Sequence, residues 1–161
     1  MSLEEQIVKE LIKRGYTVTT AESCTGGLLA GRILNVAGAS EIYNEGYITY
    51  SNEAKHRLLG VSETSLQMYG AVSREVATEM SVGVANAANA TIGLSTTGIA
   101  GPGGGTAEKP VGLVYVGCCI KIGSKCDARV RECRFQGTRE ENRNAAVEAA
   151  LQLLWNILSK S

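Results

Sequence analysis

The chain has very few of the residues on which most hydrolytic and metal-dependent sites depend. Its 161 residues include one histidine, His56, and one aspartate, Asp127. A histidine-rich metal site is therefore excluded, and any Ser-His or Cys-His mechanism must use His56. If the protein is a hydrolase, it needs a base of another kind, and lysine is the natural candidate.

An excess of charge of one sign is absent, and so are long apolar runs. Lysine plus arginine and aspartate plus glutamate number 16 each, so the formal net charge is zero. This balance supplies no field that would attract nucleic acid or an anionic membrane. No apolar run approaches the roughly 18 residues of a transmembrane helix, and residues 1–15 lack the apolar segment of a secretory signal. We expect a cytoplasmic protein with neither nucleic acid nor membrane as partner.

Cysteine is present, but not in a pattern that indicates a bridge or a metal. The five cysteines are an odd number and contain no C-x-x-C pair. Four of them fall in or directly beside the predicted hairpin strands, where a buried thiol behaves as a small apolar side chain. We expect no disulfide and no metal site. The five are Cys24, Cys118, Cys119, Cys126 and Cys133.

Helices and strands are expected to alternate over the first two thirds of the chain. Capping boxes at residues 2–5 and 138–141 predict the starts of the first and last helices. Helices are expected over residues 3–14, 26–36, 52–59 and 62–69, and two more begin at residues 73 and 138. Strands are expected over residues 16–22, 43–50 and 91–97. A hairpin of two further strands, 110–122 and 127–135, is expected to turn at residues 123–124. This order predicts an α/β fold, one layered domain over residues 1–161 with a mixed β-sheet and helices on both faces.

Three polar segments fall where a predicted strand gives way to a helix or a loop. They span residues 20–27 (TAESCTGG), 50–55 (YSNEAK) and 97–105 (TGIAGPGGG). The first is expected to leave backbone N–H groups open at a helix N-terminus, where an anion or a polar ligand can bind. Three such junctions in one small domain predict a ligand site.

The third segment is rich in glycine but matches neither a Walker A loop nor G-x-G-x-x-G. The residues concerned are Gly98, Gly101, Gly103 and Gly104. Without Cβ atoms, such residues let backbone N–H groups approach a phosphate or a carboxylate closely. A flexible connection after the strand explains the same composition, and both interpretations stay open.

Lys55 is the candidate base. If Asn52 caps the helix, Lys55 stands at its third position, where the helix N-terminus, Arg57 and His56 disfavour the ammonium form, as burial does. A lysine held in this way can act as a general base, although most lysines in a first turn are solvated. Local sequence does not choose among the candidate nucleophiles, which are Ser23, Cys24, Ser40 and Ser51.

Two arginines follow the last capping box. Arg139 and Arg143 are four residues apart, so they share one face of the predicted helix. They can clamp a phosphate, or they can pair on the surface with Glu140 or Glu148. The sequence does not decide between these roles.

Five segments in order resemble the CinA C-terminal domain family in its stand-alone form, over nearly the whole chain. They span residues 20–27, 49–55, 70–73, 97–102 and 108–112. The enzymatic members of this family are nicotinamide-nucleotide amidases, also called nicotinamide mononucleotide deamidases. The resemblance implies hydrolysis of nicotinamide mononucleotide to nicotinate mononucleotide and ammonia in pyridine nucleotide salvage, with no cofactor and no metal.

The resemblance also implies roles for individual residues. Ser40 would be the nucleophile and Lys55 the base that deprotonates it. The substrate-binding positions would be Ser23, Tyr50, Thr97 and Arg139, with Arg143 as the alternative to Arg139. Gly103 stands where relatives often carry aspartate.

Two other functions remain open at this point. The same segments would serve a module that binds a pyridine nucleotide without hydrolysing it. The historical name of the family suggests instead an interaction protein linked to DNA uptake or damage response. We expect the protein to bind its small-molecule substrate and further copies of itself.

Overall fold

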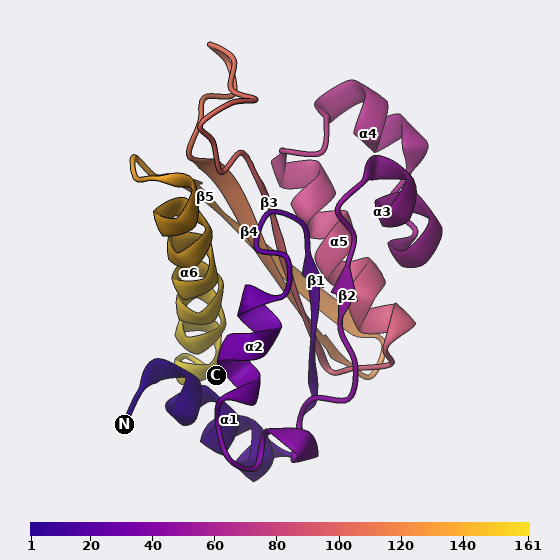
Figure 1. Ribbon diagram of the computed structural model, residues 1–161. Coiled ribbons are helices and arrows are strands. Elements are labelled where there is room, and N and C mark those ends of the chain that lie inside the picture. The colour runs from indigo at the N-terminus through magenta and orange to yellow at the C-terminus, as the bar shows by residue number, and fades with distance from the viewer.

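Five strands form one open sheet with helices on both faces (Figure 1). The computed structural model describes residues 1–161. The strands are β1 (Val18–Glu22), β2 (Tyr47–Ile48), β3 (Ile92–Gly98), β4 (Leu113–Ile122) and β5 (Lys125–Arg134), in the spatial order β2-β1-β3-β4-β5. The first three run parallel, β4 runs antiparallel to β3, and β5 runs antiparallel to β4. The predicted mixed α/β sheet is confirmed.

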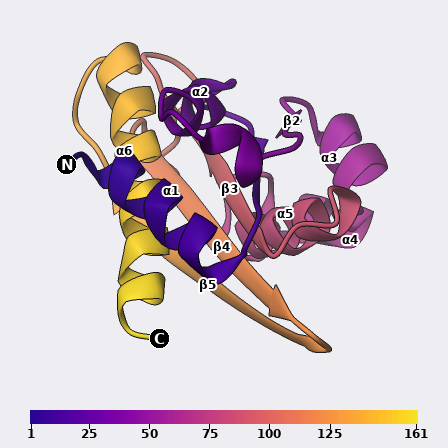
Figure 2. The same ribbon diagram turned by 90° about the horizontal axis from the view of Figure 1, so that it is seen from below.

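The helices divide between the two faces of the sheet (Figure 2). On one face lie α1 (Leu3–Arg14), α2 (Leu28–Leu34) and α6 (Arg139–Ser159). On the other, α5 (Arg74–Ala87) packs on the strands, and α3 (Asn52–Leu59) and α4 (Glu63–Tyr69) pack on α5. Both faces of β1 and β3 are therefore covered.

Each face of the sheet has its own hydrophobic core. The larger core joins α1, α2 and α6 to the strands through side chains such as Leu11, Ile33 and Leu151, all 0% exposed. The smaller one packs Val76 and Met80 of α5 under β1. Each such side chain contributes roughly 1.5–3 kcal/mol when fully buried.

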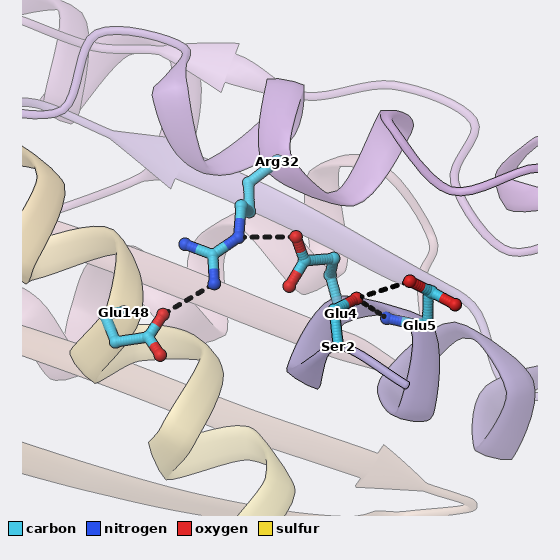
Figure 3. A network of polar contacts seen from close by, with 5 residues as sticks. All are labelled: Ser2, Glu4, Glu5, Arg32 and Glu148. Atoms are coloured by element: carbon cyan, nitrogen blue, oxygen red, sulfur yellow. Dashed lines mark hydrogen bonds and ion pairs between the residues drawn. The ribbon is translucent and has the colours of Figure 1, made fainter.

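The two capping boxes behave differently. At α6, Glu141 N–H donates to Thr138 Oγ1 at 3.2 Å, and Thr138 N–H donates to Glu141 Oε1 at 2.8 Å, as predicted. At α1, Ser2 caps through Glu5 N–H, but the Glu5 carboxylate accepts from the Ser2 hydroxyl instead of its N–H (Figure 3).

Ion pairs join the three helices of the first face. Arg32 on α2 donates to Glu4 on α1 at 2.7 Å and to Glu148 on α6 at 2.6 Å (Figure 3). One guanidinium therefore bridges two other helices.

Two elements are shortened the most relative to the sequence prediction. The helix expected over 26–36 begins only at Leu28, because Gly26 and Gly27 have φ of 54° and 103°, outside the helical region. The strand expected over 43–50 is reduced to Tyr47–Ile48, since Ile42 and Glu45 bond to β1 outside the ladder, through Val18 N–H and Thr19 Oγ1.

None of the helices combines the length and apolar character that a bilayer span demands.

Candidate functional site

The three polar junctions meet at the carboxyl ends of the parallel strands, at the top of Figure 1. Ser23 follows β1, and its N–H donates to the Thr96 carbonyl of β3 at 3.0 Å. Lys55 of α3 reaches the same turn from beyond β2. Ligands of open α/β sheets bind outside this edge, so the three junctions lie where a ligand site is expected.

Lys55 is the largest fully buried side chain, with 1% of its surface exposed. Its Nζ donates to Ser23 Oγ at 3.0 Å and to the carbonyls of Thr49 and Tyr50 at 2.9 and 3.1 Å. No ion pair involves it. An amine is thus held in the interior by neutral oxygens alone.

This environment changes the protonation of the amine. Burial lowers the pKa of Lys55 from 10.5 to about 8. About a tenth of the molecules then carry a neutral amine at pH 7, against about 0.03% for an ordinary lysine. The predicted direction of the pKa is confirmed, and desolvation is its cause.

The neighbours expected to assist Lys55 take other contacts. Ser51, not Asn52, caps α3, since Ala54 N–H donates to Ser51 Oγ at 3.0 Å, and Lys55 is therefore the fourth helical residue. His56 contacts the Val61 carbonyl and lies 3.6 Å from Glu63. Arg57 pairs with Glu53.

The pairing of Ser40 with Lys55 that the resemblance implied is not formed. Ser40 is exposed in the 3-10 helix η1 (Ala39–Glu41), and the next residue, Ile42, bonds to Val18 at the start of β1. Lys55 lies beyond the other end of that strand. A strand advances about 3.3 Å per residue, so the length of β1 places the two side chains on the order of 13 Å apart or more. Ser23 is the serine that Lys55 contacts.

The N-terminus of α2 is not open to an anion. Glu22, 1% exposed, accepts from the N–H groups of Gly27, Leu29 and Ala30 at 3.1, 2.9 and 3.0 Å. It also accepts from the Thr25 hydroxyl at 2.5 Å. The predicted anion site at this helix is therefore wrong, because the chain supplies its own carboxylate there.

Arg139 and Tyr50 form the exposed rim of the site. Arg139 Nη1 donates to the Gly101 carbonyl at 2.8 Å, and its Nη2 lies 3.5 Å from the Tyr50 hydroxyl. Tyr50 is 66% exposed while its own carbonyl holds Lys55. These two side chains remain accessible to a ligand.

Thr97 and Arg143 are engaged inside the protein. Thr97 is 1% exposed and its hydroxyl donates to the Ala71 carbonyl at 2.8 Å. Arg143 donates from Nε to the Cys24 carbonyl at 2.9 Å and from Nη2 to the Thr25 carbonyl at 3.2 Å. Thr97 therefore supports the fold beside the site, and Arg143 holds the turn that carries Ser23.

The glycine-rich loop is anchored at its base. Asn142 donates to the Ala100 carbonyl at 2.9 Å, and Gly112 N–H donates to the Ile99 carbonyl at 2.7 Å. Gly98 belongs to β3, where a Cβ would lie 2.5 Å from a Val114 methyl group, so its lack of a side chain serves sheet packing.

The other three glycines lie beyond this base. Gly101 and Gly104 have φ of 85° and 88°, which favours glycine, and a Cβ on Gly103 would meet nothing within 4 Å. These features suit a turning loop with or without a bound phosphate.

Ser23 and Lys55 do not line the prominent surface cavities. These four cavities have volumes of about 370–540 Å³ and lie elsewhere on the protein. Ser23 is only 8% exposed. The buried amine beside a hydroxyl, and not the size of a cavity, identifies the site.

Comparison with known proteins gives one consistent result. A sequence profile of the family described as CinA C-terminal domain matches residues 1–158. Proteins named as competence-damage inducible in Clostridium acetobutylicum and Clostridium novyi are each 53% identical, over 150 and 154 residues. The chain spans 36% of the length of these curated relatives.

Solved structures agree over nearly their whole length. The competence/damage inducible protein CihA of Agrobacterium tumefaciens is 42% identical with a TM-score of 0.92, covering 98% of this chain and 93% of its own. A CinA superfamily protein of Klebsiella pneumoniae is 34% identical with a TM-score of 0.90, covering 99% and 97%.

Proposed function

The chain belongs to the CinA C-terminal domain family, and on that premise we propose that it hydrolyses nicotinamide mononucleotide to nicotinate mononucleotide and ammonia. The observation that supports amide hydrolysis is the 3.0 Å contact between the buried Lys55 amine and the Ser23 hydroxyl. The choice of substrate rests on the resemblance of the sequence to the enzymatic members of the family.

In this proposal Ser23 is the nucleophile and neutral Lys55 the general base. Lys55 Nζ takes the hydroxyl proton as Ser23 Oγ attacks the carboxamide carbon, giving a tetrahedral intermediate and an ammonium on Lys55. That ammonium returns its proton to the leaving nitrogen, ammonia departs, and an ester on Ser23 remains. Water then attacks the ester with Lys55 again as base, which releases nicotinate mononucleotide and restores the hydroxyl.

The pKa of Lys55 suits both halves of this cycle. A base is most effective when its pKa lies near the working pH, because it must accept a proton and then give it up. With a pKa of about 8, Lys55 meets this condition. Cys24, by contrast, has its pKa raised to about 11 by burial, so its thiol is a poor nucleophile.

The exposed rim provides groups for the rest of the substrate. Arg139 uses one Nη group on Gly101, which leaves guanidinium donors for a phosphate. Tyr50 offers a ring face and a hydroxyl beside it. We assign the 5′-phosphate to Arg139 together with the loop after Gly101.

Ammonia release from nicotinamide mononucleotide tests the proposal. Ser23→Ala and Lys55→Met are expected to lower kcat by about 10⁴-fold or more, while Ser40→Ala, the matched control, keeps wild-type activity. Binding without turnover by the wild type would indicate the non-catalytic module. Loss of activity in chelator with rescue by a divalent ion would reject the mechanism.

A further inference from the structure

Arg143 makes two contacts that the proposed reaction leaves unexplained. It lies on α6, and its guanidinium donates to two consecutive carbonyls of the turn after β1, those of Cys24 and Thr25, at 2.9 and 3.2 Å. No ion pair involves it. A half-buried arginine thus has the backbone of the Ser23 turn as its partner instead of a carboxylate.

The peptide planes of the turn are fixed by these and two further contacts. Gly26 N–H donates to the Ser23 carbonyl at 3.2 Å, and Ser23 N–H donates to Thr96. In a planar trans peptide the C=O and the next N–H point in opposite directions. By holding the Thr25 carbonyl, Arg143 sets the direction of Gly26 N–H, and the bond from Gly26 N–H to the Ser23 carbonyl sets the direction of Cys24 N–H.

Cys24 is the residue of the turn that has a free N–H and is not fully buried. Neither Cys24 N–H nor Thr25 N–H donates to any protein atom, whereas Gly27, Leu29 and Ala30 donate to Glu22. Cys24 is 7% exposed, but Thr25 is 0% exposed. Thr25 N–H is therefore out of reach of a substrate, whereas Cys24 N–H directly follows Ser23 in the chain. Enzymes with a serine nucleophile commonly use the N–H of the following residue to stabilise the oxyanion.

We propose that Arg143 is a positioning residue, which holds the turn so that Cys24 N–H points toward the carboxamide oxygen as negative charge develops on it. This inference rests on the proposed function and deepens it. Arg143 acts through the backbone without touching the substrate. It differs in this respect from Arg139, whose guanidinium lies on the exposed rim.

Two other roles for Arg143 make different predictions. A phosphate ligand would raise KM for the nucleotide and would not matter for nicotinamide riboside, which lacks the phosphate. A purely structural anchor would lower stability and leave kcat unchanged in molecules that remain folded. A positioning residue lowers kcat for the nucleotide and the riboside alike.

The test compares Arg143→Met and Arg143→Lys with the wild type. Arg14→Met is the matched control, since Arg14 donates to the Leu158 carbonyl at 2.7 Å near the far end of α6. Initial rates of ammonia release give kcat and KM for both substrates. Labelling of Ser23 by phenylmethanesulfonyl fluoride, followed by mass spectrometry, reports the same serine without an amide substrate.

For Arg143→Met we expect kcat to fall by about 10²-fold, the effect of losing one oxyanion donor, with KM changed by less than about threefold. Labelling of Ser23 should slow in parallel. Arg143→Lys, which replaces the two donating nitrogens with one ammonium, should give an intermediate rate, and Arg14→Met should match the wild type. If Arg143→Met does not fold, the intermediate rate of Arg143→Lys carries the test.

The possible failures are separable. A wild-type kcat in the folded Arg143 variants, or a change confined to KM for the nucleotide, overturns the role of Arg143 and leaves the proposed function standing. If the wild type is labelled on Ser23 but releases no ammonia, the proposed substrate is rejected. The labelling rates of the variants then test the role of Arg143. A wild type that is neither labelled nor active overturns the reacting serine, and Arg143 with it.

Discussion

Replacing Lys55 with methionine should change how the free energy of unfolding depends on pH. Methionine is similar in length but cannot be protonated. In the folded protein burial lowers the pKa of Lys55 to about 8, while the unfolded chain restores the ordinary value of 10.5. Between these values the unfolded state binds a proton that the folded state does not, so stability rises with pH in this window.

The size of the effect follows from the two pKa values. At about 1.36 kcal/mol per pH unit, the difference corresponds to a cost of about 3 kcal/mol in the folded state below pH 8. This cost disappears as pH rises toward 10.5, because both states then hold a neutral amine. The side chain is 1% exposed, so solvent does not screen it.

Urea unfolding of the wild type and Lys55→Met, at pH values from 7 to 10.5, measures the effect. The difference between the two proteins cancels the other groups that titrate in this range. It should shift in favour of the wild type by about 3 kcal/mol over the series. Lys13→Met, which removes an exposed amine from α1, is the control. A difference that is constant with pH, or that falls, refutes a buried amine with a lowered pKa.

Three further outcomes follow from the same structure. The kcat/KM for ammonia release should rise nearly tenfold per pH unit below pH 8 and level off above it as Lys55 loses its proton, and a profile flat from pH 6 to 8 would contradict the role of the amine. Glu22→Gln should lower the free energy of unfolding by about 2–4 kcal/mol, because an amide cannot accept from all three N–H groups at the start of α2. The midpoint of urea unfolding measures this effect, and an unchanged midpoint argues against it. Asn142→Leu should lower the free energy of unfolding by about 1–3 kcal/mol, because it leaves the Ala100 carbonyl and both backbone groups of Gly137 unbonded. The variant should also be cleaved faster in the glycine-rich loop during limited proteolysis, and equal digestion rates would contradict this expectation.

Local sequence was sufficient for much of the fold. Caps and apolar periodicity place α1, α5 and α6, and the alternation of strands and helices predicts the mixed sheet. Where the prediction failed, backbone contacts outside regular elements decided the outcome. Segment 42–45 bonds to β1 before the β2 ladder begins, and this shortens the strand expected there.

The serine that contacts Lys55 could not be chosen from local sequence. Ser23 and Ser40 each follow an element and stand beside glycine or small residues, so both suit a turn. What separates them is which end of β1 each one reaches, and long-range pairing decides that. The signal for Ser23 was its place directly after a parallel strand, the edge at which ligands bind in such sheets.

The N-terminus of α2 shows a second limit of local reasoning. Open N–H groups at a helix start are a general anion site, and the residues after β1 supply them. The carboxylate that fills the site is Glu22, which stands directly before the turn and is buried by the later packing of β3. The sequence contains this glutamate, but only the folded turn shows that its carboxylate accepts from the N–H groups at the start of α2.

One face of α6 determines the geometry of two loops that are far apart in the sequence. Arg139, Asn142 and Arg143 stand at i, i+3 and i+4, and therefore project from one side of the helix. The first two donate to carbonyls of the glycine-rich loop and the third to the turn that carries Ser23. Any shift of α6 along its axis would move the rim that we assign to the phosphate together with the turn that we assign to the oxyanion. The spacing between the groups that bind the phosphate and those that bind the amide would then be set by one helix, α6. The position of α6 depends in turn on the Arg32–Glu148 ion pair and on the hydrophobic core beneath it.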